Sequence, residues 1–310
     1  MSTETTRLAL ALVGCGRMGA NHARILSHHS GARLAAVVDA NADAAAALAA
    51  QHGVPALGLD ALPGRVDGVV VAAATAAHPF LVEVLLEAGL PVLVEKPLAA
   101  DHASAAPLVA LAEARGLPLA VGMVERFNPA VAGLAGWLAG QRIDGLEARR
   151  ANPGSGRIID ASVLVDLMIH DLDVVLHLLS NRAPDRTALV ATAPRGGSAD
   201  HAVATLAWGE EAHTTTVASL TASRISHVRA RHLTVWAERG TAVLDYTAQS
   251  VTLHTAEGES VLPITRADQL TAELTAFADW IRTGAPSGSV TGREALTALA
   301  VLDRLAEAAA

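Results

Sequence analysis

Short apolar runs alternate with alanine-rich amphipathic segments over the first 125 residues. The runs are rich in valine and leucine, which is typical of strands buried on both faces. They cover residues 8–13, 33–38, 68–73, 91–94 and 117–121. The amphipathic segments are long enough for helices and cover residues 18–28, 42–51, 79–88 and 102–115. This alternation predicts an α/β fold in which an N-terminal Rossmann domain has a doubly wound parallel sheet.

The pattern changes after about residue 128. One long helical pattern, at 163–179, is followed by strand-like runs that are separated by turns. These runs cover residues 188–192, 202–208, 214–220, 232–237 and 241–244, and helical patterns follow at 269–283 and 292–309. Strands joined by turns predict a C-terminal α+β domain with an open, mainly antiparallel sheet. We therefore expect two domains, at 1–125 and at 126–310, with the last helix packing back on the first domain.

Composition narrows the class of partner. The 310 residues are 51% hydrophobic and carry a formal net charge of −8, with scattered arginines and no basic run. Nucleic acids and anionic membranes are therefore poor partners, and a small-molecule substrate is favoured. The single cysteine, Cys15, cannot form an internal disulfide, and no apolar stretch approaches the roughly 18 residues of a membrane span. These features favour a cytoplasmic protein.

A glycine motif follows the first predicted strand and opens the first predicted helix. Gly14 permits a tight turn, Gly16 lets the backbone approach a pyrophosphate, and Gly19 allows close packing of helix and strand. The anion then lies at the helix N-terminus, beside Arg17 and Met18, which we count as cofactor contacts. The alternative interpretation is an ordinary glycine turn.

Asp39 lies 20 residues beyond Gly19, at the end of the second predicted strand. A carboxylate there can accept hydrogen bonds from both ribose hydroxyls and would repel a 2′-phosphate, so NAD is preferred over NADP. FAD is a smaller rival. Thr75 and His78 follow the third predicted strand and are predicted cofactor contacts, although His78 could instead cap its helix.

Lys96 is the only lysine among 23 basic residues. It follows Glu95 at the end of the fourth predicted strand, on the edge where open α/β sheets bind ligands, and we assign both residues to the cofactor site. A lysine ammonium can give and take a proton, whereas arginine stays protonated. We therefore predict a catalytic role for Lys96, and the alternative is a chance surface lysine.

The long helical pattern of the second half carries Asp166, His170, Asp173 and His177 on one stripe, at offsets of 4, 7 and 11 residues. Such a polar stripe is costly to bury unless it faces a ligand. A core histidine and a metal site are the alternatives. We expect no metal, because the glycine motif already supplies a redox cofactor.

Together these motifs resemble the glucose–fructose oxidoreductase / inositol dehydrogenase (Gfo/Idh/MocA) family over nearly the full chain. The resemblance rests on Gly14 to Gly19, on Glu95-Lys96-Pro97, on the segment 122–129 and on the segment from Asp166 to Asp173. The last two segments are most similar to the branch of UDP-N-acetylglucosamine 3-dehydrogenases.

The resemblance implies hydride transfer between nicotinamide C4 and a secondary carbinol or ketone of a sugar, nucleotide sugar or cyclitol. Lys96 and His170 would handle the proton, and Asp166 would orient His170 or bind a neighbouring hydroxyl. Arg126, Asn128 and Asp173 are predicted substrate contacts, with a salt bridge as the alternative for Arg126. The resemblance also implies that the first domain binds NAD and that the second binds the substrate and forms a homodimer or homotetramer through its open sheet.

Three alternatives to this function stay open. The first is a keto-sugar or cyclic-imine reductase in a biosynthetic pathway. The second is a glycosidase that uses NAD for transient oxidation. The third, disfavoured because Lys96, Asp166 and His170 are all present, is a non-catalytic NAD-sensing regulator.

Overall fold

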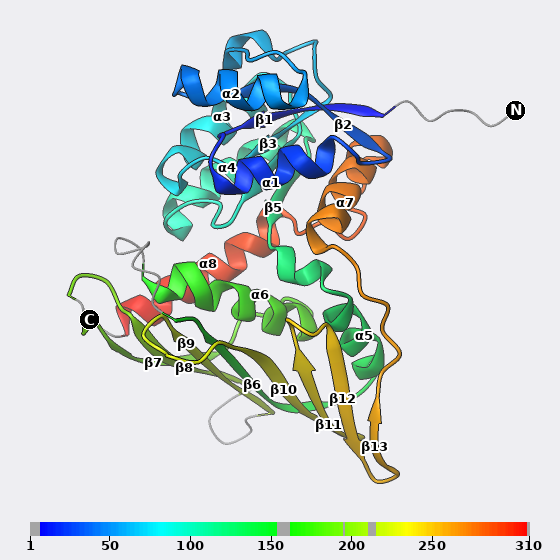
Figure 1. Cartoon of the computed structure of the whole chain (residues 1–310). Coiled ribbons are helices and arrows are strands. Elements are labelled where there is room, and N and C mark those ends of the chain that lie inside the picture. Colours follow the sequence, from blue (N-terminus) through cyan, green and yellow to red (C-terminus); the bar gives the residue numbers. More distant parts are fainter. Residues whose placement is uncertain (1–6, 154–161, 195, 210–214, 309–310) are drawn as a thin grey trace, which may run out of the picture. The chain divides into compact units, whose positions relative to one another are not determined.

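The computed structural model describes residues 7–153, 162–194, 196–209 and 215–308 (Figure 1). The chain divides into two compact units, residues 1–123 with 270–296 (unit 1) and residues 124–269 with 297–310 (unit 2). The segment 270–296, predicted in the second domain, thus belongs to unit 1, and the last helix contributes residues to both units. Within the described residues, no helix is both long enough and apolar enough to cross a membrane.

Unit 1 contains the predicted parallel sheet, in the order β2-β1-β3-β4-β5. Its strands are β1 Leu8–Val13, β2 Ala32–Val38, β3 Gly68–Val71, β4 Val92–Glu95 and β5 Leu119–Gly122. The helices are α1 Arg17–Leu26, α2 Ala42–His52, α3 His78–Glu87, α4 His102–Arg115, nearly all of α7 Gln269–Thr283 and the first residues of α8 Gly292–Glu307. Short 3-10 turns lie at η1 Leu59–Ala61 and η2 Thr75–Ala77. The Rossmann-type sheet predicted from the apolar runs is confirmed.

Capping residues and glycines mark where two helices of unit 1 begin and end. Asp101 accepts a hydrogen bond from the Ser104 N–H at the start of α4, and Gly116, at a φ of +63°, ends that helix. Asn41 caps α2 in the same way, and Gly53 ends it in the left-handed region. Side-chain caps and C-terminal glycines satisfy the polar groups that a helix end leaves unpaired.

The strand order decides where ligands can bind. β1 lies between β2 and β3, so the chain passes from β1 to β2 on one side and then crosses to β3 on the other side. Ligands of open parallel sheets bind outside the carboxyl ends of the strands at such a reversal. The glycine motif, Asp39, Thr75 and Lys96 each follow the carboxyl end of one of the four strands β1 to β4.

Unit 2 is built on an eight-stranded sheet in the order β13-β12-β11-β10-β6-β9-β8-β7. Its strands are β6 Ile143–Ala151, β7 Arg186–Thr192, β8 His201–Trp208, β9 Thr216–Ser223, β10 Ala230–Ala237, β11 Gly240–Asp245, β12 Ser250–Thr255 and β13 Gly258–Val261. Among the described strands of this sheet, β6 pairs with β9 in parallel and every other neighbouring pair is antiparallel, which confirms the mainly antiparallel sheet. β6 itself was not predicted, because its charged residues hide the strand pattern.

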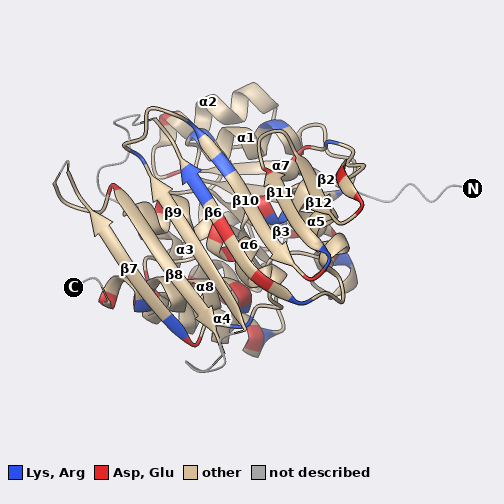
Figure 2. Ribbon diagram, turned by 90° about the horizontal axis from the view of Figure 1, so that it is seen from below, with Lys and Arg blue, Asp and Glu red and all other residues tan. Residues whose placement is uncertain are grey.

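Helices cover one face of this sheet. α5, Pro129–Leu138, packs on β11 and β12, and α6, Ile169–Leu178, packs on β6 and β9. A short 3-10 turn, η3 Val124–Phe127, precedes α5, and a π-helical turn, η4 Leu164–Met168, precedes α6. The opposite face exposes Val190, Val217 and Trp236, and its strands β7, β8 and β9 are almost without charged residues (Figure 2).

Candidate active site

The glycine motif forms a loop in which two glycines are required by the fold and one faces open space. Gly14 has a φ of +99°, and a Cβ there would lie 2.6 Å from the Ala72 backbone. A Cβ on Gly19 would lie 1.9 Å from the Gly14 carbonyl oxygen. By contrast, a Cβ on Gly16 would meet no atom within 4 Å. The loop therefore presents a bare backbone at Gly16, where a ligand can approach closely.

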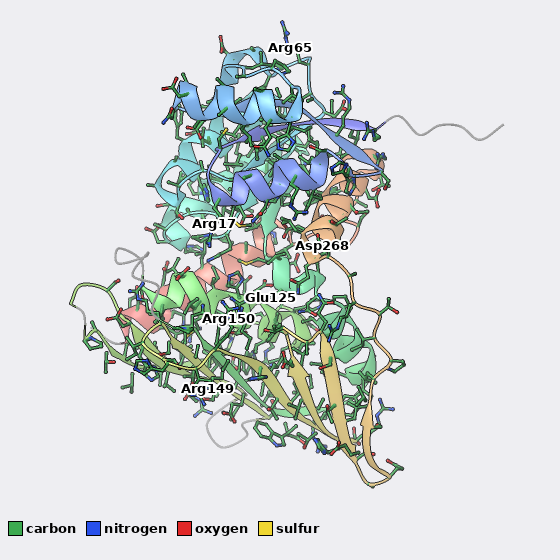
Figure 3. All side chains as sticks on the ribbon, in the orientation of Figure 1. Arg17, Arg65, Glu125, Arg149, Arg150 and Asp268 are labelled. Atoms are coloured by element: carbon green, nitrogen blue, oxygen red, sulfur yellow. The ribbon has the colours of Figure 1, made fainter. Side chains whose placement is uncertain are left out.

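The N-terminus of α1 follows directly and suits an anion. Gly16 is its N-cap and offers no side-chain cap, and no acidic residue lies in the first turn. The first backbone N–H groups and the helix dipole therefore favour negative charge, and the exposed Arg17 adds a positive one (Figure 3). These residues fit the pyrophosphate of a dinucleotide. Met18, half-buried, and Gly19, buried, complete the first turn.

Asp39 is held against the glycine loop. Its two carboxylate oxygens accept hydrogen bonds from the backbone N–H groups of Cys15, at 2.7 Å, and Asn41, at 2.8 Å. Each oxygen can accept a further hydrogen bond, so the carboxylate keeps capacity for ribose hydroxyls. Burial and the nearby Asp39 charge raise the pKa of the Cys15 thiol, which disfavours a reactive thiolate.

Lys96 is half-buried in the bend after β4, between two residues that histidines hold in place. On one side, the Nε2 of buried His22 lies 2.8 Å from Glu95 Oε1. On the other, His78 Nδ1 lies 2.8 Å from the carbonyl oxygen of Pro97. The position of the Lys96 backbone is thus fixed by the side chains of α1 and α3.

His78 is 1% exposed, and its second ring nitrogen lies 3.1 Å from the Ala73 carbonyl oxygen. It does not cap α3 through its side chain; it joins the loop after β3 to the residue after Lys96. A cofactor contact by His78 stays a prediction. Thr75 lies half-buried in η2, directly after that loop.

The four residues of the predicted Asp/His stripe lie in two successive elements, η4 and α6. Asp166 lies within η4 and His170 follows it, and both are half-buried. A π-helical turn inserts one residue into a helix, so the regular offsets assumed from the sequence do not hold at Asp166. Asp173 and His177 lie further along α6 and hold Arg126.

Arg126 forms a forked ion pair with Asp173, at 2.8 Å and 2.9 Å. It also lies 3.0 Å from His177 Nδ1 and donates to Asn181 Oδ1 at 3.2 Å. Its side chain is 7% exposed. The salt-bridge interpretation of Arg126 therefore has direct geometric support, and its role as a substrate contact stays a prediction.

Asn128 is fully buried and caps α5. Its Oδ1 accepts from the Ala130 N–H, and its Nδ2 donates to the Tyr246 carbonyl oxygen, both at 3.0 Å. These bonds give Asn128 a structural role in unit 2, and nothing tests its predicted contact with substrate.

A second buried network was missed from the sequence. Arg150, on β6, donates to both carboxylate oxygens of Asp171, at 2.8 Å and 2.9 Å, and to Glu125 at 2.9 Å (Figure 3). Burial by itself lowers the pKa of Arg150, but Asp171 and Glu125 outweigh it and raise that pKa above its usual value. The guanidinium also lies 5.1 Å from the Tyr246 ring centroid. Asp171, a charged residue within the mainly apolar helical pattern at 163–179, was the signal that could have revealed this network.

Glu273 was missed for a similar reason. It lies on α7 among the apolar side chains Leu270, Leu274, Phe277 and Ile281, which belong to the unit 1 core or pack against it. An acid at helical spacing within such a stripe is the sequence signal. His22, Glu95 and Glu273 bring their ring-nitrogen and carboxylate atoms within 4.8 Å of one another.

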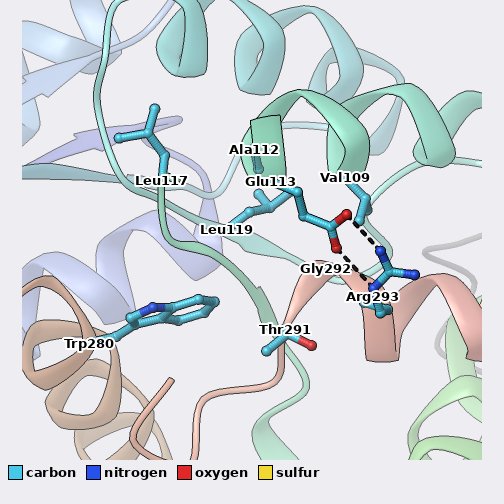
Figure 4. Close-up of a pocket in the computed structure, with 9 residues that line it drawn as sticks. All are labelled: Val109, Ala112, Glu113, Leu117, Leu119, Trp280, Thr291, Gly292 and Arg293. Carbon is cyan, nitrogen blue, oxygen red and sulfur yellow. Dashed lines mark hydrogen bonds and ion pairs between the residues drawn. The ribbon is translucent and has the colours of Figure 1, made fainter. Parts of the chain in front are cut away.

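Unit 1 also contains a pocket of about 220 Å³. It is lined largely by apolar side chains of α4, β5 and α7, with Trp280 on one wall and an Arg293–Glu113 ion pair beside it (Figure 4). None of the predicted site residues lines this pocket.

The parallel sheet, its glycine loop and the acid after β2 define a Rossmann-type oxidoreductase. A family model for oxidoreductases with an NAD-binding Rossmann fold matches residues 8–123. The chain is 33% identical to UDP-N-acetylglucosamine 3-dehydrogenase of Acidithiobacillus ferrooxidans over 302 residues, which cover 93% of each protein. It therefore belongs to the Gfo/Idh/MocA family of oxidoreductases.

Two further similarities agree with this. The solved structure of the Acidithiobacillus ferrooxidans enzyme superposes with a TM-score of 0.91 over 98% of each chain, at 30% identity. Myo-inositol dehydrogenase Hyg17 of Streptomyces leeuwenhoekii is 38% identical over 182 residues, 54% of each protein. The family resemblance seen in the motifs is thus confirmed.

Proposed function

We propose that this protein is an NAD-dependent dehydrogenase that oxidises the 3-hydroxyl of UDP-N-acetylglucosamine to a ketone. The observation that carries the proposal is the end-to-end similarity to the Acidithiobacillus ferrooxidans enzyme, in sequence and in fold. A match over 93% of the chain extends well into unit 2, and it bears on substrate choice more than a match to the nucleotide-binding domain does.

A cyclitol is the second candidate substrate. Several inositol dehydrogenases are 30–38% identical to this chain, but over only 54–58% of its length. The shorter match favours the nucleotide sugar.

The cofactor residues support NAD rather than NADP. Asp39 adds a negative charge beside the loop, where it would repel a 2′-phosphate, while the glycine loop and α1 N-terminus suit the pyrophosphate. Bound nicotinamide would supply a hydride acceptor.

Lys96 and His170 are proposed to handle the proton of the reacting hydroxyl. An ammonium next to a ketone also stabilises the developing alkoxide in the reverse direction. Asp166 would orient the imidazole of His170 or bind a neighbouring hydroxyl.

We further propose a homodimer or homotetramer that forms through the open face of the unit 2 sheet, in the cytoplasm. That face exposes Val190 at 73% and Val217 and Trp236 at 42% each. A double Val190→Glu, Trp236→Glu variant should sediment as a smaller species than the wild type. A wild type that already sediments as a monomer would rule this assembly out.

The activity test is NADH absorbance with purified protein. UDP-N-acetylglucosamine, free N-acetylglucosamine, UDP-glucose and myo-inositol are each offered with NAD⁺ and with NADP⁺. We expect reduction of NAD⁺ with UDP-N-acetylglucosamine and little with the others. Turnover only with myo-inositol would establish the second candidate, and sugar release without net NADH would establish the glycosidase alternative.

A further inference from the structure

Glu273 is a buried acidic residue, and no cationic group among the described residues lies within hydrogen-bonding distance of its carboxylate. The residue is 2% exposed, and among the described residues neither of its carboxylate oxygens has a hydrogen-bond partner. An ionised carboxylate in such a place costs several kcal/mol, so the group either binds a cation or keeps its proton.

The groups that face it are His22 on α1 and Glu95 on β4. Glu95 brings a second carboxylate to within 4.8 Å, which makes two negative charges there still more unfavourable. Burial, and then the charge of Glu95, raise the pKa of Glu273 well above its ordinary value of 4.5.

The hydrogen bond between His22 and Glu95 indicates where the protons lie. His22 Nε2 is 2.8 Å from Glu95 Oε1, whereas the buried Nδ1 of His22 has no partner. An imidazole with its proton on Nε2 satisfies this arrangement, because it donates to Glu95 and leaves only an acceptor unpaired. A metal ion on Nε2 would displace that bond and leave a buried N–H at Nδ1 without an acceptor.

We propose that Glu273 is a positioning residue that keeps its proton beside the Glu95 carboxylate, and that His22, Glu95 and Glu273 together fix the end of β4 that carries Lys96. Lys96 is the residue after Glu95, so a displacement of the Glu95 side chain is transmitted directly to the Lys96 backbone. The inference deepens the proposed function, on which its effect on turnover rests.

The first test compares thermal unfolding of the full chain and of Glu273→Gln as a function of pH. Above the ordinary pKa, the unfolded chain releases the Glu273 proton while the folded chain keeps it, so wild-type stability falls as pH rises. Glutamine has no proton to lose. We therefore compare the Tm of Glu273→Gln minus the Tm of wild type at two pH values. This difference should be at least about 3 °C larger near pH 8 than near pH 5.

The matched control is Glu83→Gln, the same change at an exposed position on α3. Its Tm difference from wild type should not vary with pH. A difference for Glu273→Gln that is equally flat would overturn the proposal. So would one equivalent of a divalent metal in the purified wild type that is lost from Glu273→Gln.

The second test exploits the single lysine. Reductive methylation with ¹³C-formaldehyde labels the α-amino group and one lysine, Lys96, whose separate methyl signal reports its surroundings without any substrate. Glu273→Leu should move this signal, and Glu273→Gln, which keeps a neutral polar group of the same size, should leave it near the wild-type position. If Glu273→Leu does not fold, Glu273→Met takes its place. An unmoved signal in the apolar variant would refute the positioning role.

Kinetics then distinguish the positioning role of Glu273 from the proposed dehydrogenase activity. With UDP-N-acetylglucosamine as substrate, Glu273→Leu should lower kcat about tenfold and leave the Kd for NAD⁺ unchanged, because only the position of Lys96 is disturbed. A wild type without turnover would refute the proposed function alone, since the Tm and NMR tests need no substrate.

Discussion

The two units build their chemistry in different ways. In unit 1 the cofactor residues follow strand ends, and backbone geometry decides their use: Gly14 and Gly19 close the loop, and Gly16 leaves it bare. In unit 2 the predicted Asp and His residues lie in η4 and α6, and the ion-pair partners of the α6 acids come from other elements. Arg150 on β6 and Arg126 in η3 hold acids of α6.

The two units should therefore respond differently to substitutions. A backbone-built site tolerates changes of side chain except where a Cβ would collide, whereas a buried ion-pair network loses charge balance when one member is removed. The following variants, ordered from the largest expected effect to the smallest, test this contrast.

Removal of the Arg150 charge should have the largest effect on stability. Arg150→Met leaves Asp171 and Glu125 buried without their cation, and we expect a loss of about 3–5 kcal/mol in the free energy of unfolding, measured in urea. Arg142→Met, which breaks an exposed ion pair with Asp144, is the control and should have little effect. A loss below about 1 kcal/mol for Arg150→Met would mean that this network does not stabilise unit 2.

Substitution of Lys96 should lower kcat and leave the affinity for NAD⁺ unchanged. Lys96→Arg and Lys96→Met should each lose at least about 10²-fold in kcat, because a positioned proton-transfer group is gone. Calorimetry should show unchanged affinity for NAD⁺, and the exposed Arg65→Met serves as control (Figure 3). Near-normal turnover of Lys96→Arg would exclude proton transfer by Lys96.

A methyl group should have opposite consequences at two glycines of one loop. Gly19→Ala should destabilise the fold by about 1–3 kcal/mol, since its Cβ would collide with the Gly14 carbonyl. Gly16→Ala should leave Tm unchanged and weaken NAD⁺ binding, because only the ligand would meet the new atom. Equal Tm values for the two variants would argue against the loop geometry described above.

The smallest effect is expected at Asp39. Asp39→Asn keeps an oxygen for the Cys15 N–H but removes the charge, and should weaken NAD⁺ binding about tenfold while NADP⁺ binding is unchanged or improved. Both affinities are measured by fluorescence titration. A parallel loss for both cofactors would show that Asp39 acts on the loop and not on the ribose.

The sequence by itself determined the Rossmann sheet and the position of its ligand edge. Strands buried on both faces are continuous apolar runs, and capping residues and glycines mark helix ends, so periodicity located β1 to β5 closely. The glycine loop was equally readable, because its requirement for residues without a Cβ is local.

Only the tertiary structure decided which polar residues meet. β6 escaped notice because Arg149 and Arg150 interrupt its apolar pattern, although Arg150 is buried by partners from α6 and η3. Asp166 lies in a π-helical turn, η4, which the regular helical pattern of the sequence did not predict. Glu273 is 178 residues from Glu95 in the chain, and its contact with Glu95 follows from the packing of α7 in unit 1. Local sequence encodes local geometry, but the neutralisation of a buried charge depends on a partner that only the fold brings near.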